Sequence, residues 1–213
     1  MRLRWAGVAA AGAAVLLGAG PLAVPGAAGA AAGAVRAAGS WGRAIEVPGL
    51  GALDKGGNAK VSSVSCASAG NCAAGGFYRD GSGLYQGFVV SERNGRWGQA
   101  IEVPGLGGLN KGGLQFAGVG SVSCASPGNC AADGSYYTDT TGHQQAFVVS
   151  QKNGRWGNAL TVPGLGILNK GGNAEVTSVS RAAAGSCVAG GNYQVPGRLA
   201  FQAFVTQDGP RTR

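Results

Sequence analysis

The side chains of this sequence that could carry out acid–base chemistry are few and scattered. A glycosidase needs two carboxylates about 5–10 Å apart, and no spacing among the acidic residues singles out such a pair. Asp80 and Asp139 are the best acidic candidates, and both are expected to form turns between strands. The single histidine, His143, lies in a polar run and is expected to be solvated. The acidic residues are Glu46, Asp54, Asp80, Glu92, Glu102, Asp133, Asp139, Glu175 and Asp208.

The cysteines are spaced for disulfide bonds rather than for metal binding. Two Cys-x5-Cys spacings bracket predicted turns, and in an exported chain such spacing indicates disulfides. We therefore predict the pairs Cys66–Cys72 and Cys124–Cys130, each clamping a hairpin at its turn. Cys187 has no partner in its own turn, because Arg181 stands in the place of the first cysteine. We expect a buried, unpaired thiol there, with a link to another chain as the alternative. No metal site and no cofactor is expected.

The N-terminal segment has the three regions of a secretory signal peptide. Arg2 and Arg4 are followed by an uncharged Ala/Leu/Val run and then by small residues, which is the expected order. We predict a signal peptide over 1–30, with the cleavage point left open between residues 30 and 39, and an Ala/Gly-rich linker over 31–40. The mature protein is then secreted, with no membrane association. An uncleaved membrane anchor is the alternative, because the uncharged run is long enough to span a bilayer.

The composition of the rest favours turns and short strands. The chain has 42 glycines, and only 12% of its residues are charged. Glycine costs about 1 kcal/mol in a helix interior, so long helices are not expected. The formal net charge of +8 overstates that of the mature chain, because two arginines lie in the signal peptide. The basic residues are not concentrated in one stretch, so nucleic acid is not an expected partner.

The mature part consists of three copies of one repeat, in a domain covering 41–213. Each copy begins Trp-Gly-x-Ala, at Trp41, Trp97 and Trp156. It continues with Val-Pro-Gly-Leu, a Lys-Gly-Gly loop, Ser-Val-Ser and Gln-(Gly/Ala)-Phe-Val. The repeats span 41–96, 97–155 and 156–213. Self-similarity of this kind points to propellers, solenoids or arrays.

Four strand signals fall within each repeat, and we name these strands A, B, C and D. In the first copy they cover 61–65, 72–78, 85–91 and 96–103. Asn94-Gly95 lies between C and D and is a strong hairpin signal, because both residues of a type I′ turn need φ > 0. Four antiparallel strands joined by tight turns make a blade-sized sheet. Antiparallel alternation places the A–B and C–D turns at one end of each sheet and the B–C and D–A loops at the other.

The two ends of the domain complement each other. The segment 41–47 reads as an extra D strand, whereas the third repeat stops after its C–D turn at Asp208-Gly209. We therefore predict that the N-terminal strand pairs with the last sheet and supplies its fourth strand.

Two recurring residue types mark the B–C and D–A end as the candidate binding surface. Lysines at one position of each D–A loop could bind an anionic polymer or a protein partner through several weak contacts, and tyrosines at the ends of the B strands could stack on sugars. Solvated lysines and tyrosines that only pack the sheets are the alternative. These residues are Lys55, Lys111, Lys170, Tyr78, Tyr136 and Tyr193.

The chain resembles secreted actinobacterial proteins made of tandem Ser-Val-Ser-Cys…Gln-Ala-Phe-Val…Asn-Gly-x-Trp repeats. The resemblance covers 41–209 and implies propeller-like blades, but those proteins are mostly uncharacterised and it implies no substrate. The Asn-Gly hairpins are also similar to the Asp-box turn of sialidase-type propellers, which bears on topology alone. Three blades are fewer than the 4–8 of ordinary propellers. The predicted all-β fold is therefore a half-propeller, a threefold closed form, or a β-prism or trefoil-like arrangement.

The sequence thus favours a secreted, non-catalytic module that binds a glycan, a cell-wall polymer or a protein. A propeller-type glycoside hydrolase or sialidase-like enzyme is one alternative, and a structural assembly unit is another. The sequence also predicts self-association to a dimer, since unpaired edge strands invite pairing.

Overall fold

The computed structural model describes residues 41–111, 116–183 and 185–208. The chain divides into two units, Met1–Arg43 and Ala44–Arg213, and the fold described here is that of the second. The predicted signal peptide and linker, 1–30 and 31–40, lie outside the described residues. No helix within the described ranges is long and apolar enough to cross a membrane.

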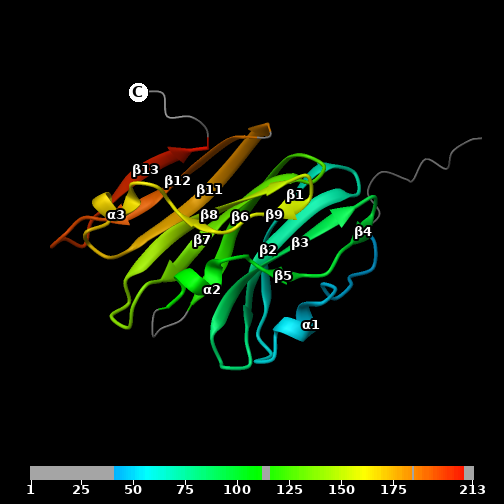
Figure 1. Cartoon of the computed structure of the whole chain (residues 1–213), viewed down its shortest axis with the longest axis horizontal. Helices are drawn as coiled ribbons and strands as arrows, with labels where there is room; N and C mark the ends of the chain where they lie inside the picture. The colour runs from blue at the N-terminus through cyan, green and yellow to red at the C-terminus, as the bar shows by residue number, and fades with distance from the viewer. Residues whose placement is uncertain (1–40, 112–115, 184, 209–213) are drawn as a thin grey trace, which may run out of the picture. The chain divides into compact units, whose positions relative to one another are not determined.

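The second unit is all-β, with three antiparallel sheets that follow one another along the chain (Figure 1). Sheet 1 contains β1 (Lys60–Ser68), β2 (Asn71–Arg79), β3 (Tyr85–Arg93), β4 (Arg96–Trp97) and β5 (Ile101–Glu102). Sheet 2 contains β6 (Ala117–Ser126), β7 (Asn129–Tyr137), β8 (Gln144–Lys152), β9 (Arg155–Trp156) and β10 (Leu160–Thr161). Sheet 3 contains β11 (Ala174–Ala183), β12 (Ser186–Gln194) and β13 (Phe201–Gln207). The predicted strands A, B and C are confirmed in all three copies.

Strand D differs from the prediction, because it forms two short pieces on either side of a break. In sheet 1 both β4 and β5 pair with β3. Between them the chain leaves the ladder, and the Ala100 N–H donates to the Pro48 carbonyl at 2.7 Å. The Ala159 N–H makes the same bond to the Pro104 carbonyl, also at 2.7 Å. The D strand is therefore interrupted where it bonds to the loop of the preceding repeat.

The A–B and C–D turns meet at one end of each sheet, which we call the turn end. Asn94 and Asn153 both have φ 50°, and the following glycines both have φ 77°, as the predicted type I′ hairpins require. The Gly95 N–H donates to the Gly70 carbonyl at 2.9 Å, so the two turns of sheet 1 are bonded to each other. Sheet 2 repeats this contact at 2.7 Å between Gly154 and Gly128.

The D–A and B–C loops meet at the opposite end, which we call the loop end. Each Val-Pro-Gly-Leu signature forms a turn that opens a one-turn helix, and sequence reasoning missed these helices. They are α1 (Leu50–Leu53), α2 (Leu106–Leu109) and α3 (Leu165–Leu168). The glycine before each helix is left-handed, with φ 79° at Gly49, so it suits the third position of a type II turn. The first leucine of each helix is buried and anchors the loop.

The three sheets pack side by side through their A strands, with β6 in contact with both β1 and β11. The Ser-Val-Ser signature explains this contact. In β6, Val122 is buried, while its N–H donates to the Ser63 hydroxyl of β1 at 3.0 Å. The Cys124 N–H donates to the Ser65 hydroxyl, also at 3.0 Å. Because side chains alternate along a strand, the valines face the preceding sheet and the serines face the next one.

The predicted pairing of segment 41–47 with the last sheet is not formed within one chain. In the ranges that the structure describes, these residues belong to no strand, and sheet 3 contains three strands rather than four. The reason is spatial: Pro48 is bonded to Ala100 of sheet 1, and Ile45 and Val47 line a small cleft with Val64 of β1. Because β6 of sheet 2 packs against both β1 and β11, that cleft and sheet 3 lie on opposite sides of sheet 2.

Candidate functional site

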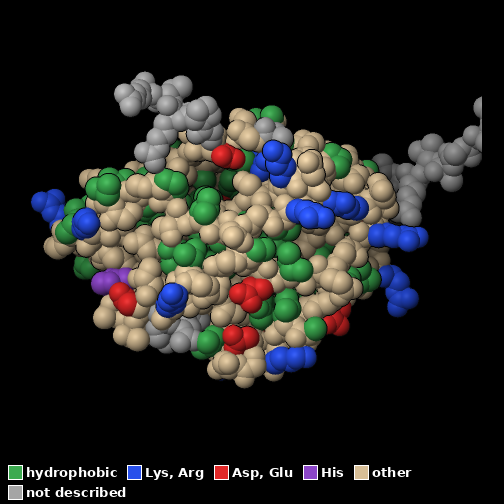
Figure 2. Space-filling model, viewed as in Figure 1, with side chains coloured by type: hydrophobic (Ala, Val, Ile, Leu, Met, Phe, Trp, Pro, Cys, Tyr) green, Lys and Arg blue, Asp and Glu red, His purple; other side chains and the backbone are tan. Residues whose placement is uncertain are grey.

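The recurring lysines occupy equivalent, exposed positions at the loop end. The Lys55 N–H donates to the Leu53 carbonyl at 2.9 Å, and Lys111 and Lys170 make the same bond at the same distance. All three side chains are exposed. The predicted position of the lysines is therefore confirmed, and their role in binding stays a prediction. On the face drawn in Figure 2, Lys and Arg side chains are more numerous toward the upper right of the view, and isolated ones lie elsewhere.

The residue before each lysine fixes this turn to a sheet. The side-chain amide of Asn110 donates to the Tyr85 carbonyl at 3.3 Å, and that of Asn169 donates to the Gln144 carbonyl at 2.9 Å. Each of these bonds joins the loop to the C strand of the preceding sheet. Asp54 stands at this position in the first repeat, and its carboxylate accepts instead from the backbone N–H of Arg79 at 3.1 Å. The lysines are thus held on turns of matching geometry.

Two of the three tyrosines pack within the sheets and do not offer ring faces to a sugar. Tyr78 and Tyr136 are each only 3% exposed. The Tyr78 hydroxyl donates to a carboxylate oxygen of Glu102 at 3.1 Å, and the Tyr136 hydroxyl lies 2.6 Å from that of Thr161. Burial, together with the Glu102 carboxylate, raises the pKa of Tyr78 well above its usual range. The predicted stacking role is therefore wrong for these two residues, because their rings are covered.

Tyr193, the third tyrosine, is only partly buried, in sheet 3. Its hydroxyl donates to the side-chain carbonyl of Gln202 at 2.7 Å. In sheets 1 and 2 a D-strand residue, Glu102 or Thr161, bonds to the tyrosine hydroxyl. Among the described residues, sheet 3 has no fourth strand that could supply such a partner to Tyr193.

The candidate acidic residues of the B–C loops order turns. The Asp80 carboxylate accepts from the N–H groups of Ser82 and Leu84, at 2.8 and 3.0 Å. The Asp139 carboxylate accepts from the Thr141 hydroxyl at 2.6 Å and contacts His143 Nδ1 at 2.6 Å. These hydrogen bonds, led by that of Thr141, lower the pKa of Asp139 to about 2. Sequence reasoning missed the Asp–His pair, although the i, i+4 spacing across a Thr-Thr-Gly turn could have signalled it.

The cysteine predictions are confirmed. Disulfide bonds join Cys66 to Cys72 and Cys124 to Cys130, whereas Cys187 is free and buried. Burial is the largest influence on the Cys187 thiol and raises its pKa. In the part of the chain that the structure covers, no group of three or more His, Cys, Asp or Glu side chains is arranged to hold a metal ion.

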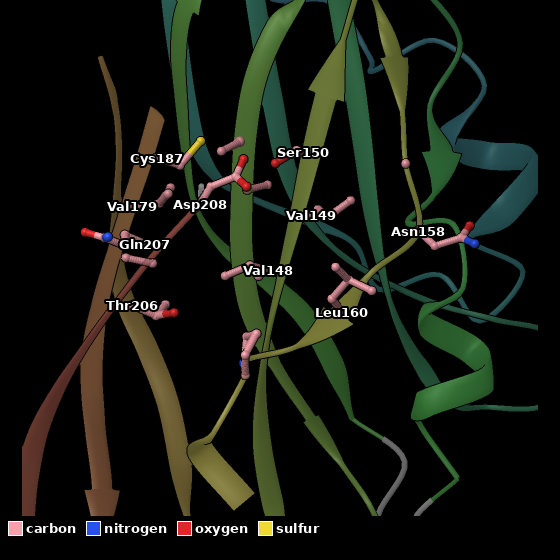
Figure 3. Close-up of a pocket in the computed structure, with 15 residues that line it drawn as sticks. Val148, Val149, Ser150, Asn158, Leu160, Val179, Cys187, Thr206, Gln207 and Asp208 are labelled. Atoms are coloured by element: carbon pink, nitrogen blue, oxygen red, sulfur yellow. The ribbon is translucent and has the colours of Figure 1, made fainter. Parts of the chain in front are cut away.

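A cleft of about 360 Å³ opens between sheets 2 and 3, and no sequence signal predicted it. Its walls are mostly apolar, with Val148, Val149 and Val179 among the residues that line it. Figure 3 shows that Ser150, Cys187 and Asp208 gather at one end of it. Three polar groups on an apolar wall could orient a planar, mostly apolar ring with one polar edge.

The corresponding place between sheets 1 and 2 is occupied by an indole ring. Trp156 packs there against buried core residues, and its Nε1–H donates to the Ser91 hydroxyl at 3.3 Å. Ser150 of the cleft is the repeat counterpart of Ser91. The cleft is therefore the space that a tryptophan fills at the previous junction.

Two charged residues are also buried in the second half of the molecule. Asp133 of β7 is 0% exposed, and burial raises the pKa of its carboxyl to about 8, partly offset by the backbone amide of Ser121. Arg181 of β11 is buried, and one guanidinium nitrogen donates to the Cys130 carbonyl at 2.6 Å. Glycines stand where Asp133 does in the other two repeats, at Gly75 and Gly190.

Comparisons with known proteins give no family. No protein-family model matches the chain, and no curated protein matches it either.

Proposed function

We propose that this protein is a secreted, non-catalytic binding module that holds an anionic polymer, such as an acidic glycan or cell-wall polymer, at its loop end. The observation that carries the proposal is the threefold repetition of an exposed lysine on one backbone turn, at Lys55, Lys111 and Lys170. Each turn is bonded to a sheet, so the three ammonium groups extend from anchored positions.

Repetition matters because one exposed ion pair contributes little. A single surface contact between opposite charges is worth about 0.2–1 kcal/mol. A polymer with regularly spaced anionic groups contacts several lysines at once, and the later contacts form at high effective concentration. The binding is then weak per site, dependent on several sites and sensitive to salt.

Other features of the chain are consistent with this role. Two disulfide bonds indicate an oxidising compartment, which supports export. Asp80 and Asp139 are engaged in turns and Glu102 in a bond to a tyrosine, so no observation favours the alternative of a hydrolase.

The test compares two triple variants that remove the same charge from opposite ends of the sheets. The first is Lys55→Ala, Lys111→Ala, Lys170→Ala. The matched control is Arg96→Ala, Lys152→Ala, Arg155→Ala, which changes exposed cations at the turn end. Binding to an acidic polysaccharide, with neutral dextran as a blank, is measured by calorimetry at low and physiological salt.

We expect the lysine variant to bind about tenfold more weakly or worse. The control is expected to stay within about twofold of the parent, since its cations lie away from the loop end. Equal loss in both variants would mean that net charge alone attracts the polymer, and unchanged binding in the lysine variant would overturn the proposal.

A further inference from the structure

The first sheet exposes a valine face that its counterparts bury. Val64 of β1 is 56% exposed, whereas the equivalent Val122 and Val179 are buried against the sheet that precedes them. Val61 of the same strand is also exposed, whereas its counterparts in sheets 2 and 3 are buried. We call this surface of β1 the head face. On the equivalent side, sheet 2 packs against sheet 1, and sheet 3 packs against sheet 2.

The last sheet exposes the opposite side of the same contact. Val205 of β13 is 82% exposed, and its counterpart Val89 in sheet 1 is buried. Val188 of β12 is likewise exposed where Ala73 and Ala131 are buried. Ser178 and Ser180 of β11 are exposed, although the equivalent serines of β1 and β6 accept backbone N–H bonds from the next sheet. We call this surface the tail face.

The head and tail faces are the two halves of a junction that the chain already builds twice. At the first junction Ala73 and Val89 of sheet 1 share one core cluster with Val122 of sheet 2. At the second junction Ala131 of sheet 2 shares a cluster with Val176 and Val179 of sheet 3. A third junction of the same kind would place Val188 and Val205 against Val61 and Val64. A single chain cannot form this third junction, because sheet 2 lies between the head face on sheet 1 and the tail face on sheet 3.

The segment before Pro48 is placed as a D strand, but none of the described sheets of its own chain pairs with it. The Pro48 carbonyl accepts from the Ala100 N–H, just as the Pro104 carbonyl accepts from the Ala159 N–H. Residues 45–47 therefore have the same position relative to sheet 1 as β5 has relative to sheet 2. In sheet 1, Ile101 of β5 pairs with Val89 of β3. The equivalent pairing would join Ile45 to Val205, two side chains that are both exposed in the single chain.

Two side-chain positions follow from the same register. Glu46 is the counterpart of Glu102, which accepts from Tyr78, so Glu46 would replace the Gln202 side chain as the acceptor of the Tyr193 hydroxyl in sheet 3. Trp41 is the counterpart of Trp156 and is 99% exposed. Its indole would enter the cleft between sheets 2 and 3 and donate to Ser150, as Trp156 donates to Ser91.

We propose that the head face of one copy of this chain docks on the tail face of a second copy, and that the N-terminal segment of the first completes sheet 3 of the second. Two such junctions, related by a twofold axis, close a ring of six sheets. That number lies within the range of known propellers, and closed twofold dimers are the commonest soluble oligomers. The inference does not depend on the lysines of the loop end.

The junction between chains has fewer hydrogen bonds available than the two within the chain. Asp54 stands where Asn110 and Asn169 donate to the preceding sheet, and a carboxylate cannot make that donation. The dimer is therefore expected to dissociate on dilution while each chain stays folded.

The mass of the purified protein is measured by analytical ultracentrifugation at several concentrations, with Val64→Glu and Val205→Glu as test variants. Both side chains are exposed in the single chain, so neither change should disturb folding, which circular dichroism checks. We expect a dimer for the parent, and about 30-fold or greater weakening in each variant, because a charge would be buried at the centre of the junction.

Mixing the two variants distinguishes head-to-tail docking from other contacts. Val64→Glu leaves its own tail face intact and Val205→Glu leaves its own head face intact, so the mixture can form one good junction. We expect heterodimers in the mixture that neither variant forms alone. A dimer in which the same face of both copies meets would not be restored by mixing, because each mixed pair would keep one damaged surface.

The register is tested by mixing Ile45→Cys with Val205→Cys under mild oxidation. A covalent dimer is expected from the mixture, and little from either variant alone, in which only the buried Cys187 could compete. A monomer at all concentrations, a dimer that persists in both glutamate variants, or a ladder of larger species would overturn the proposal.

Discussion

The two junctions between sheets use one repeat sequence and yet differ in their interiors. Both are joined by serine hydroxyls that accept backbone N–H bonds from the next A strand. Between sheets 1 and 2 the space is occupied by Trp156, and a Cβ at Gly75 would come within 2.6 Å of Val119. Between sheets 2 and 3 a cleft remains, and Asp133 replaces that glycine.

The strands and the packing between sheets are therefore specified by different residues. The Ser-Val-Ser alternation builds the backbone contact wherever two repeats meet. Whether the interior is filled depends on a side chain from another part of the repeat. A tryptophan completes the first junction, and its absence leaves Ser150 and Cys187 lining open space at the second.

The largest expected effect concerns Asp133, through the pH dependence of stability. Its carboxyl has a pKa of about 8 in the folded protein and near 4 when unfolded. Between these values the folded state holds a proton that the unfolded state releases, so the free energy of unfolding falls as pH rises. The total fall by pH 8 is at most about 6 kcal/mol.

Asp133→Asn should flatten this slope, since an amide does not titrate. Urea unfolding measured between pH 4 and pH 9 checks it, with Asp80→Asn, a change at a loop-end turn, as the control that keeps the slope. A parent protein whose stability does not decline across this range would show that Asp133 is ionised and compensated in the fold.

The next effect concerns the filled junction. Trp156→Ala should lower the free energy of unfolding by about 3 kcal/mol, because it removes a large packed ring and leaves a cavity. The matched control is Trp41→Ala, whose ring is 99% exposed; at concentrations where the protein is monomeric it should cost nothing. Equal losses in the two variants would mean that Trp41 is already packed within its own chain.

The smallest effect concerns the serine contacts. Ser63→Ala with Ser65→Ala removes two acceptors of backbone N–H bonds, each worth about 1 kcal/mol. Ser178→Ala with Ser180→Ala changes the equivalent, exposed hydroxyls of the last sheet. In the monomer the Ser178/Ser180 variant should keep the free energy of unfolding of the parent, and at dimer-forming concentrations it should weaken association. Thermal unfolding at low and at high protein concentration separates the effect on the stability of the monomer from the effect on association.

Much of the fold could be predicted from local patterns. The type I′ turns follow from Asn-Gly because few other residues accept φ > 0, and the paired cysteine spacing indicates the two disulfides. The assignment of loops to two ends follows from strand order alone. The one-turn helices were missed because four residues hold too little periodicity to signal a helix.

The candidate site was less accessible to such reasoning. The lysines were placed correctly because their turn recurs in the sequence. The burial of Tyr78 and Tyr136 was not predicted. The partner of the Tyr78 hydroxyl, Glu102, comes from the D strand, 24 residues along the chain. The charge state of Asp133 depends in the same way on two sheets closing over it.

The repeat, the strands, the turn types and the disulfide pairs follow from the amino-acid sequence, because each depends on residues close together in the chain. That sheet 2 separates the two ends of the domain is visible only in the folded molecule. That separation leaves residues 45–48 against sheet 1 and sheet 3 without a fourth strand among the described residues, because a strand can pair only with an edge that it can physically reach.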